Sequence, residues 1–94
     1  MKLTKNYVGY FAIDDYHVVG GHFPSVKPTG IYNNLDDCLD TLMHDVDSYH
    51  IEDSHHKRIT REDIVAAVNA DKYGYARIRF EYPREGEVTI ISNY

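Results

Sequence analysis

The segment from Leu35 to Tyr49 constrains the fold most, because its apolar residues recur at the spacing of a helix. These apolar residues are Leu35, Leu39, Leu42, Val46 and Tyr49, with Cys38 beside them. Together they form one stripe, which must be buried against another element. Asn34 is a good N-cap, and Asp36 and Asp37 follow in the first turn, where the helix dipole favours anions. We therefore predict a helix that begins after Asn34 and runs to about His50.

The residues before this helix predict strands. "NYVGYFAI" (6–13) alternates and is rich in aromatic and β-branched residues, and "YHVVGGHF" (16–23) is expected to pair with it as a hairpin. Asp14-Asp15 is the expected turn, and Gly20-Gly21 suggests a bulge. Pro24 should end the ladder, because proline cannot donate a backbone hydrogen bond. We expect "PSVKPTG" to be a loop and "GIYN" (30–33) to be a short third strand.

A second helix and a second hairpin follow. Thr60 and Asp63 have the spacing of a capping box, which predicts a helix from Thr60 to about Ala70 after an irregular loop. "YARIRFEY" (75–82) and "EVTIISNY" (87–94) then read as strands around the turn "PREG". The expected order is β-β-β-α-α-β-β in one domain covering residues 1–94. This is an α+β fold, an antiparallel sheet with both helices packed on one face.

Composition limits the function classes. The net charge of −5 argues against sequence-independent binding to nucleic acid, which requires a basic surface. We find no 18-residue apolar run and no signal-peptide pattern, so we expect neither a membrane span nor export. One cysteine excludes an internal disulfide. These features favour a cytoplasmic protein.

Acidity is concentrated in residues 33–56, which hold seven carboxylates and four histidines. On a helical wheel, the residues opposite the apolar stripe are Asp36, Asp37, Asp40, His44 and Asp47. Like charges four residues apart, such as Asp36 and Asp40, cost helix stability, and the local sequence offers no compensating cation. This row is either a solvated helix face or a recognition surface for the basic groove of a nucleic-acid-processing protein.

Metal and nucleophilic chemistry are weaker alternatives. Asp40 and His44 are neighbours on the helix and could share a metal, with further ligands from His50, His55 and His56. No H-E-x-x-H or C-x-x-C spacing is present. Cys38 lies beside the apolar stripe, where burial raises the pKa of a thiol and makes it inert. We therefore predict no catalytic residue, metal ligand or cofactor, and keep a His/Asp metal protein or metal-dependent enzyme as the alternative.

Two further surfaces come from the C-terminal hairpin. Tyr75, Arg77 and Arg79 alternate on one face of a strand and could contact a partner, although two arginines beside Glu81 are also typical of a solvated sheet face. "EVTIISNY" could pair two copies through an unpaired strand edge. A homodimeric sheet module of structural role is therefore a third hypothesis.

"IDDYHVVGGHFPSV" followed by "LDDCLDTLMHDVDSYH" resembles the HicB-type antitoxin domain over residues 6–51, about half the chain. Phe23-Pro24-Ser25-Val26 takes the place of the family's F-P-D-L segment, and residues 35–39 match L-E-E-A-L. The resemblance implies a partly RNase H-like sheet packed by one helix, without a catalytic carboxylate set. Such a domain docks on a small toxin ribonuclease and covers its active site. Where the family continues into a DNA-binding segment, this chain has a short helix and a Tyr/Arg-rich hairpin.

The leading hypothesis is a small acidic, non-enzymatic inhibitor that blocks a nucleic-acid-acting partner by protein–protein contact. The partner-binding residues would be Asp36, Asp37, Asp40, His44 and Asp47 of the helix, and Tyr75, Arg77 and Arg79 of the sheet. An antitoxin and a phage-encoded anti-defence protein, such as an anti-CRISPR inhibitor, both fit this hypothesis, because both would block their target by the same kind of protein–protein contact.

Overall fold

A computed structural model describes residues 5–17 and 21–93. Its elements are β1 (Asn6–His17), β2 (Gly21–Tyr32), α1 (Leu35–Tyr49), α2 (Arg61–Ala70), β3 (Tyr75–Phe80) and β4 (Gly86–Asn93). The α+β class and the antiparallel sheet are confirmed, but the order is β-β-α-α-β-β. No helix in the described part of the chain has the length and apolar character needed to cross a membrane.

The expected three strands before α1 are wrong, since the structure has two longer ones. Asp14 and Asp15 belong to β1, where they pair with Pro24 and Phe23 of β2 instead of forming a turn. The expected loop "PSVKPTG" and the expected strand 30–33, apart from Asn33, belong to β2. The bulge expected at Gly20-Gly21 falls partly outside the described residues, and the register shift lies between Val8 and Tyr10.

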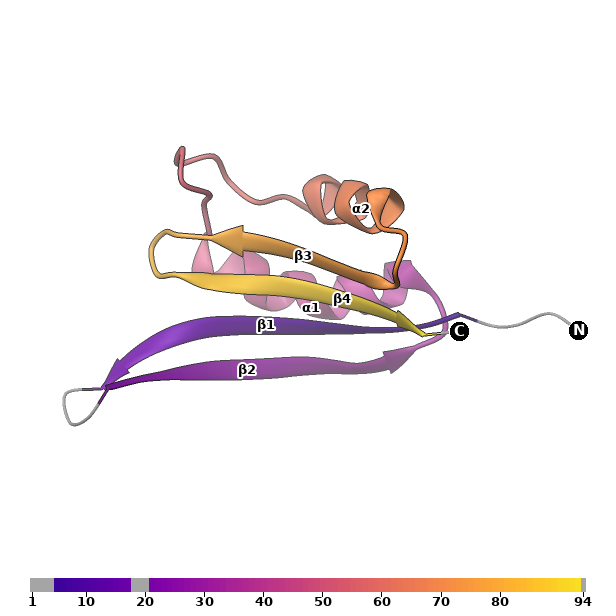
Figure 1. Cartoon of the computed structure of the whole chain (residues 1–94), viewed down its shortest axis with the longest axis horizontal. Helices are drawn as coiled ribbons and strands as arrows, with labels where there is room; N and C mark the ends of the chain where they lie inside the picture. Colours follow the sequence, from indigo (N-terminus) through magenta and orange to yellow (C-terminus); the bar gives the residue numbers. More distant parts are fainter. Residues whose placement is uncertain (1–4, 18–20, 94) are drawn as a thin grey trace, which may run out of the picture.

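The position of β2 explains why its prolines do not stop it. The strand order is β2-β1-β4-β3, so β2 is an edge strand with only one neighbour (Figure 1). Proline is tolerated on an edge strand or at a bulge, where its missing N–H leaves the ladder intact. Gly30, with φ at 91°, lies in the irregular stretch of β2 opposite the register shift.

The same order corrects the expectation for the last strand. β4 pairs with β1 on one side and with β3 on the other. It therefore has no unpaired edge, and dimerisation through the edge of β4 is wrong.

Both helices start where local capping predicts. Asn34 caps α1 by accepting a hydrogen bond from the Asp37 N–H at 2.9 Å, and His50 ends the helix in the left-handed conformation. In α2, the Asp63 N–H donates to Thr60 Oγ1 at 3.3 Å and the Thr60 N–H donates to Asp63 Oδ2 at 2.9 Å. The capping box and both helix boundaries are confirmed.

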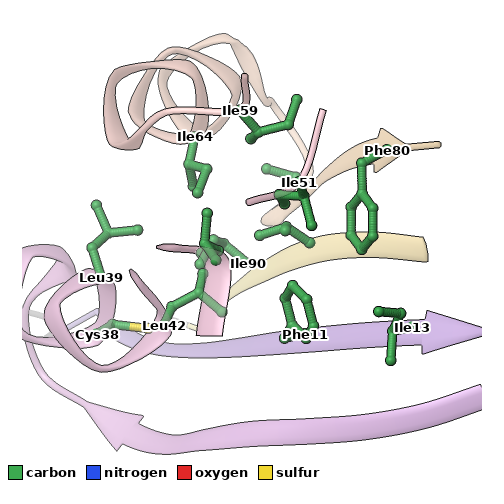
Figure 2. Packing of buried hydrophobic residues seen from close by; sticks show 13 residues of the cluster. Phe11, Ile13, Cys38, Leu39, Leu42, Ile51, Ile59, Ile64, Phe80 and Ile90 are labelled. Carbon is green, nitrogen blue, oxygen red and sulfur yellow. The ribbon is translucent and has the colours of Figure 1, made fainter. Parts of the chain in front are cut away.

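The core lies between α1, α2 and one face of the sheet. Figure 2 shows side chains from both helices converging on those of β1, β3 and β4. The Phe11 ring stacks against Tyr49 at 5.1 Å and against Phe80 at 5.5 Å between centroids. In the predicted stripe of α1, the residues Leu39, Leu42 and Val46 are fully buried, and Leu35 and Tyr49 pack at the margin. In the part of the chain that the structure describes, the opposite face of the sheet carries no helix (Figure 1).

Gly86 is required where the second hairpin passes under the Phe80 ring. A Cβ at this position would overlap the Ala12 carbonyl oxygen and the Phe80 ring. The backbone carbonyl cannot move aside without disturbing the pairing of β1 with β4. Close packing of the aromatic core against the sheet thus depends on the absence of a side chain here.

Replacing Gly86 with alanine is expected to lower the free energy of unfolding by about 2–3 kcal/mol, because overpacking displaces main chain and Phe80 together. Urea denaturation followed by circular dichroism measures the effect. The exposed Asn69→Ala change on α2 serves as control and should stay within about 0.5 kcal/mol of the parent. If Gly86→Ala lowered the free energy of unfolding as little as the control does, this would contradict the close approach of Gly86 to Ala12 and Phe80.

The connection between the helices is more ordered than the expected irregular loop. The Ile59 N–H donates to the Ile51 carbonyl at 3.1 Å, and Glu52 and Tyr82 exchange backbone hydrogen bonds. Asp53 Oδ1 accepts from the N–H groups of His55 at 2.8 Å and Lys57 at 3.0 Å. The hydrogen bond from the Lys57 N–H, followed by that from His55, holds the pKa of Asp53 below its ordinary value of 3.8.

This pKa predicts the acid response of the connection. Because the folded pKa is lowered, the contribution of the Asp53 carboxylate to stability is full above pH 3.8 and is lost as pH falls through the folded value. In NMR titrations, the amide signals of His55 and Lys57 should shift with a midpoint below pH 3.8. Asp53→Asn should remove this titration, and a midpoint above 3.8 in the parent would contradict the assignment.

Candidate functional site

The outward side of α1 carries a row of charges of one sign. The helix contains five aspartates and neither lysine nor arginine. The residues predicted to face outward, all of them exposed, are Asp36, Asp37, Asp40, His44 and Asp47. We call this side the acidic face of α1, and it opposes the buried stripe as the wheel requires.

Arg61, the first residue of α2, supplies from outside the helix a cation that the local sequence of α1 lacks. Its Nη1 donates to Asp40 Oδ1 at 2.7 Å, and its Nη2 donates to the Asp36 carbonyl at 3.1 Å and lies 3.5 Å from Asp36 Oδ1. The hydrogen bond to Asp40, with smaller contributions from Asp36, raises the pKa of the Arg61 guanidinium. Arg61 therefore relieves the repulsion between Asp36 and Asp40 and ties α2 to α1.

The remainder of the acidic face forms a shallow hollow of about 400 Å³. Its lining residues are Asp40, Met43, His44, Asp47 and Ser48. Within residues 5–17 and 21–93, the Asp47 carboxylate has no ion pair, while Arg58 lies 3.5 Å from the Asp47 backbone carbonyl. Met43, which is half-buried, supplies an apolar part of the lining. An incoming Lys or Arg could lay its aliphatic stem on Met43 and place its charge beside Asp47.

Asp45 projects away from this hollow and pairs with Lys27 of β2, with 3.5 Å between the ammonium and carboxylate atoms. Both side chains are exposed enough for this pair to be weak. The Lys27–Asp45 pair therefore leaves the acidic face unchanged, and Asp37 and Asp47 of that face remain exposed.

The predicted sheet residues Tyr75, Arg77 and Arg79 are exposed, but they lie away from the acidic face. They alternate along β3 with the buried Ala76 and Phe80, so they project from the side of the sheet that has no helix. Arg77 is 3.7 Å from Glu87, and Arg79 is 3.8 Å from Glu85 and 4.0 Å from Glu87. The two halves of the predicted partner surface, the acidic face of α1 and these residues of β3, therefore lie apart in the structure. Glu85 and Glu87 offset the charge of the two arginines.

The alternative metal ligands are not gathered into one site. In the part of the chain that the structure describes, no three His, Cys, Asp or Glu side chains converge closely enough to hold a metal ion. His56 instead stacks on Tyr82, with 4.0 Å between ring centroids, and its Nδ1 lies 3.2 Å from Glu52 Oε1. Asp40, the aspartate beside His44, is held by Arg61.

Cys38 is a packing residue, as predicted. It is fully buried, and burial raises the pKa of its thiol, with a smaller opposing effect from Thr29 and the Gly9 N–H. The Thr29 hydroxyl lies 3.6 Å from the sulfur and accepts a hydrogen bond from the Gly9 N–H. The thiol therefore fills the contact between α1 and the sheet.

Sequence reasoning missed three residues of this site: Arg61, Met43 and Ser48. Met43 and Ser48 follow from the helical spacing of Asp40, His44 and Asp47, and could have been found on the same wheel. Arg61 could not, because it is 21 residues from Asp40 and only the packing of α2 beside α1 brings them together.

Comparison of the chain with protein-family models, curated proteins and solved structures gave no match. The properties of the site therefore follow from its geometry and charge.

The link between α1 and α2 can be measured by a double-mutant cycle. Combining Arg61→Gln with Asp40→Asn should give a coupling free energy of about 0.5 kcal/mol, the range of exposed ion pairs. The coupling should shrink in high salt, because both charges are partly solvated. A cycle between Arg61→Gln and Asp47→Asn is the control and should give no coupling, since these side chains are not in contact. Equal coupling in both cycles would contradict a specific Arg61–Asp40 pair.

Proposed function

We propose that this protein is a non-enzymatic inhibitor that binds a basic, nucleic-acid-acting protein through the acidic face of α1. The observation that carries the proposal is the hollow beside Asp47, where an accessible carboxylate and an apolar wall lie together. That combination suits a lysine or arginine side chain, which has an apolar stem and a charged end. Nucleases and other nucleic-acid-binding proteins present such side chains in rows along their substrate grooves.

Electrostatics supports a partner of positive charge. Arg61 offsets part of the charge of Asp36 and Asp40, whereas Asp37 and Asp47 remain exposed on the same helix. A surface of one sign raises the rate of association with a surface of opposite sign, and added salt weakens this attraction. The acidic face would compete with phosphate for the same basic side chains, so binding would block access of nucleic acid.

The resemblance of residues 6–51 to HicB-type antitoxins supports the inhibitory role, since that family covers a toxin ribonuclease. A phage-encoded inhibitor of a host defence nuclease would use the same contacts. The partner class is therefore a basic ribonuclease, nuclease or nuclease complex, and the chain itself needs no cofactor for this role.

The proposal is tested by affinity capture from a lysate of the organism that carries the gene. Bead-bound parent chain is compared with Asp47→Lys and with the control Glu81→Lys, which makes the same charge change at an exposed site away from α1. The parent and the control should recover the same basic nucleic-acid-acting protein, with at least about tenfold less recovered by Asp47→Lys. The recovered enzyme should lose activity when the parent chain is added.

Equal recovery by all three chains would contradict the role of the acidic face. Recovery of no basic nucleic-acid-acting protein, or full activity of the recovered enzyme in the presence of the parent chain, would contradict the proposed function.

A further inference from the structure

The side of the sheet opposite α1 presents twelve residues in three rows that cross all four strands. We call it the open face. The register pairs Ile31, Val8, Ile91 and Tyr75 in the first row, Pro28, Tyr10, Thr89 and Arg77 in the second, and Val26, Ala12, Glu87 and Arg79 in the third. Neither helix of the described residues covers this face (Figure 1). It is a continuous surface with one register shift, between its first and second rows, and it lies on the other side of the sheet from α1.

The half of the open face on β1 and β2 is apolar and accessible. Ile31 is 76% exposed and Val26 is 51% exposed, and each pairs directly with an apolar residue of β1. Residues 7–13 of β1 are apolar or aromatic on both sides, apart from Gly9. Such continuous runs are typical of strands that are covered on both faces. The sequence of β1 therefore indicates that the open face is also covered.

The charges on the open face distinguish it from the acidic face. It carries Arg77, Arg79 and Glu87, a formal charge of +1, and these side chains pair with one another across β3 and β4. The open face therefore offers no strong attraction to a charged partner. The open face is therefore suited to a partner surface that, like itself, has an apolar centre and a few paired charges at the rim.

A second copy of this chain presents such a surface. Two sheets packed face to face lie about 10 Å apart, so the two α1 helices would be on the outside, roughly 30 Å from each other. This separation exceeds the Debye length of about 8 Å at physiological salt, so the acidic faces would not repel strongly. Association through the acidic faces themselves would instead bring like charges together.

The size of the face predicts a weak dimer. Four strands are about 19 Å wide and the three rows span five residues of β1, about 17 Å, which gives roughly 320 Å² of flat area per copy. Stable interfaces bury about 800 Å² per partner, and smaller ones are typical of weak association. We infer that two copies of this chain associate through their open faces, with the β1–β2 halves in contact and the arginine–glutamate pairs at the rim.

Analytical ultracentrifugation of the full chain from about 5 to about 300 µM tests this inference over the affinities expected of a small interface. The parent should shift from monomer to dimer within this range. Val26→Lys combined with Ile31→Lys should weaken dimerisation at least about tenfold, because it places charges in the apolar centre. Both residues are exposed in the monomer, so the variant should fold, which circular dichroism checks.

The control is Ala66→Lys combined with Asn69→Lys, two exposed positions of α2 with the same charge change. It should dimerise like the parent. A parent chain that stays monomeric at 300 µM would overturn the inference, as would a dimer unaffected by Val26→Lys with Ile31→Lys. A monomeric parent that binds a fluorescent oligothymidylate through Tyr10 and Tyr75 would assign the open face to single-stranded nucleic acid instead.

Discussion

The burial of the apolar stripe of α1 against β1 is the interaction on which the rest of the structure depends. Leu39, Leu42 and Val46 are fully buried, and Gly9 lets the helix come close. A Cβ at Gly9 would lie 3.0 Å from the Thr29 side chain and 3.4 Å from the Cys38 sulfur. Because the described chain has two helices, and both contribute to the same core, the other side of the sheet is left without a covering layer.

This one contact creates two surfaces of different character. It turns the aspartates of α1 outward as a surface of high negative charge, and it leaves an opposite face that is largely apolar and nearly neutral. Arg61 stabilises the arrangement by joining α2 to the acidic face without neutralising Asp47. The basic partner proposed above would bind one of these surfaces, and the second copy inferred above would cover the other. The two binding events would not compete for space.

The helices were predictable because the signals that define them are local. Asn34 and Thr60 cap their own helices through residues three positions away, and the stripe of α1 repeats within one segment. The strands before α1 were not predictable in the same way. Whether Pro24 ends a strand depends on which side of the strand is unpaired, and that depends on β4, more than 60 residues later in the chain. The aspartate pair at residues 14–15 favours a turn by its local sequence, but pairing with β2 places it inside β1.

The sequence by itself determined the fold class, the two helices with their caps, the inert environment of Cys38 and the outward direction of the aspartates of α1. Each of these follows from spacing within a few turns of chain or from the chemistry of one side chain. Only the tertiary structure decided that Arg61 reaches Asp36 and Asp40, and that Tyr75, Arg77 and Arg79 lie on the side away from α1. The tertiary structure also decided that β4 is a central strand, paired with β1 on one side and β3 on the other. Strand order and helix packing join residues far apart in the sequence, and no local pattern records which partners they will meet.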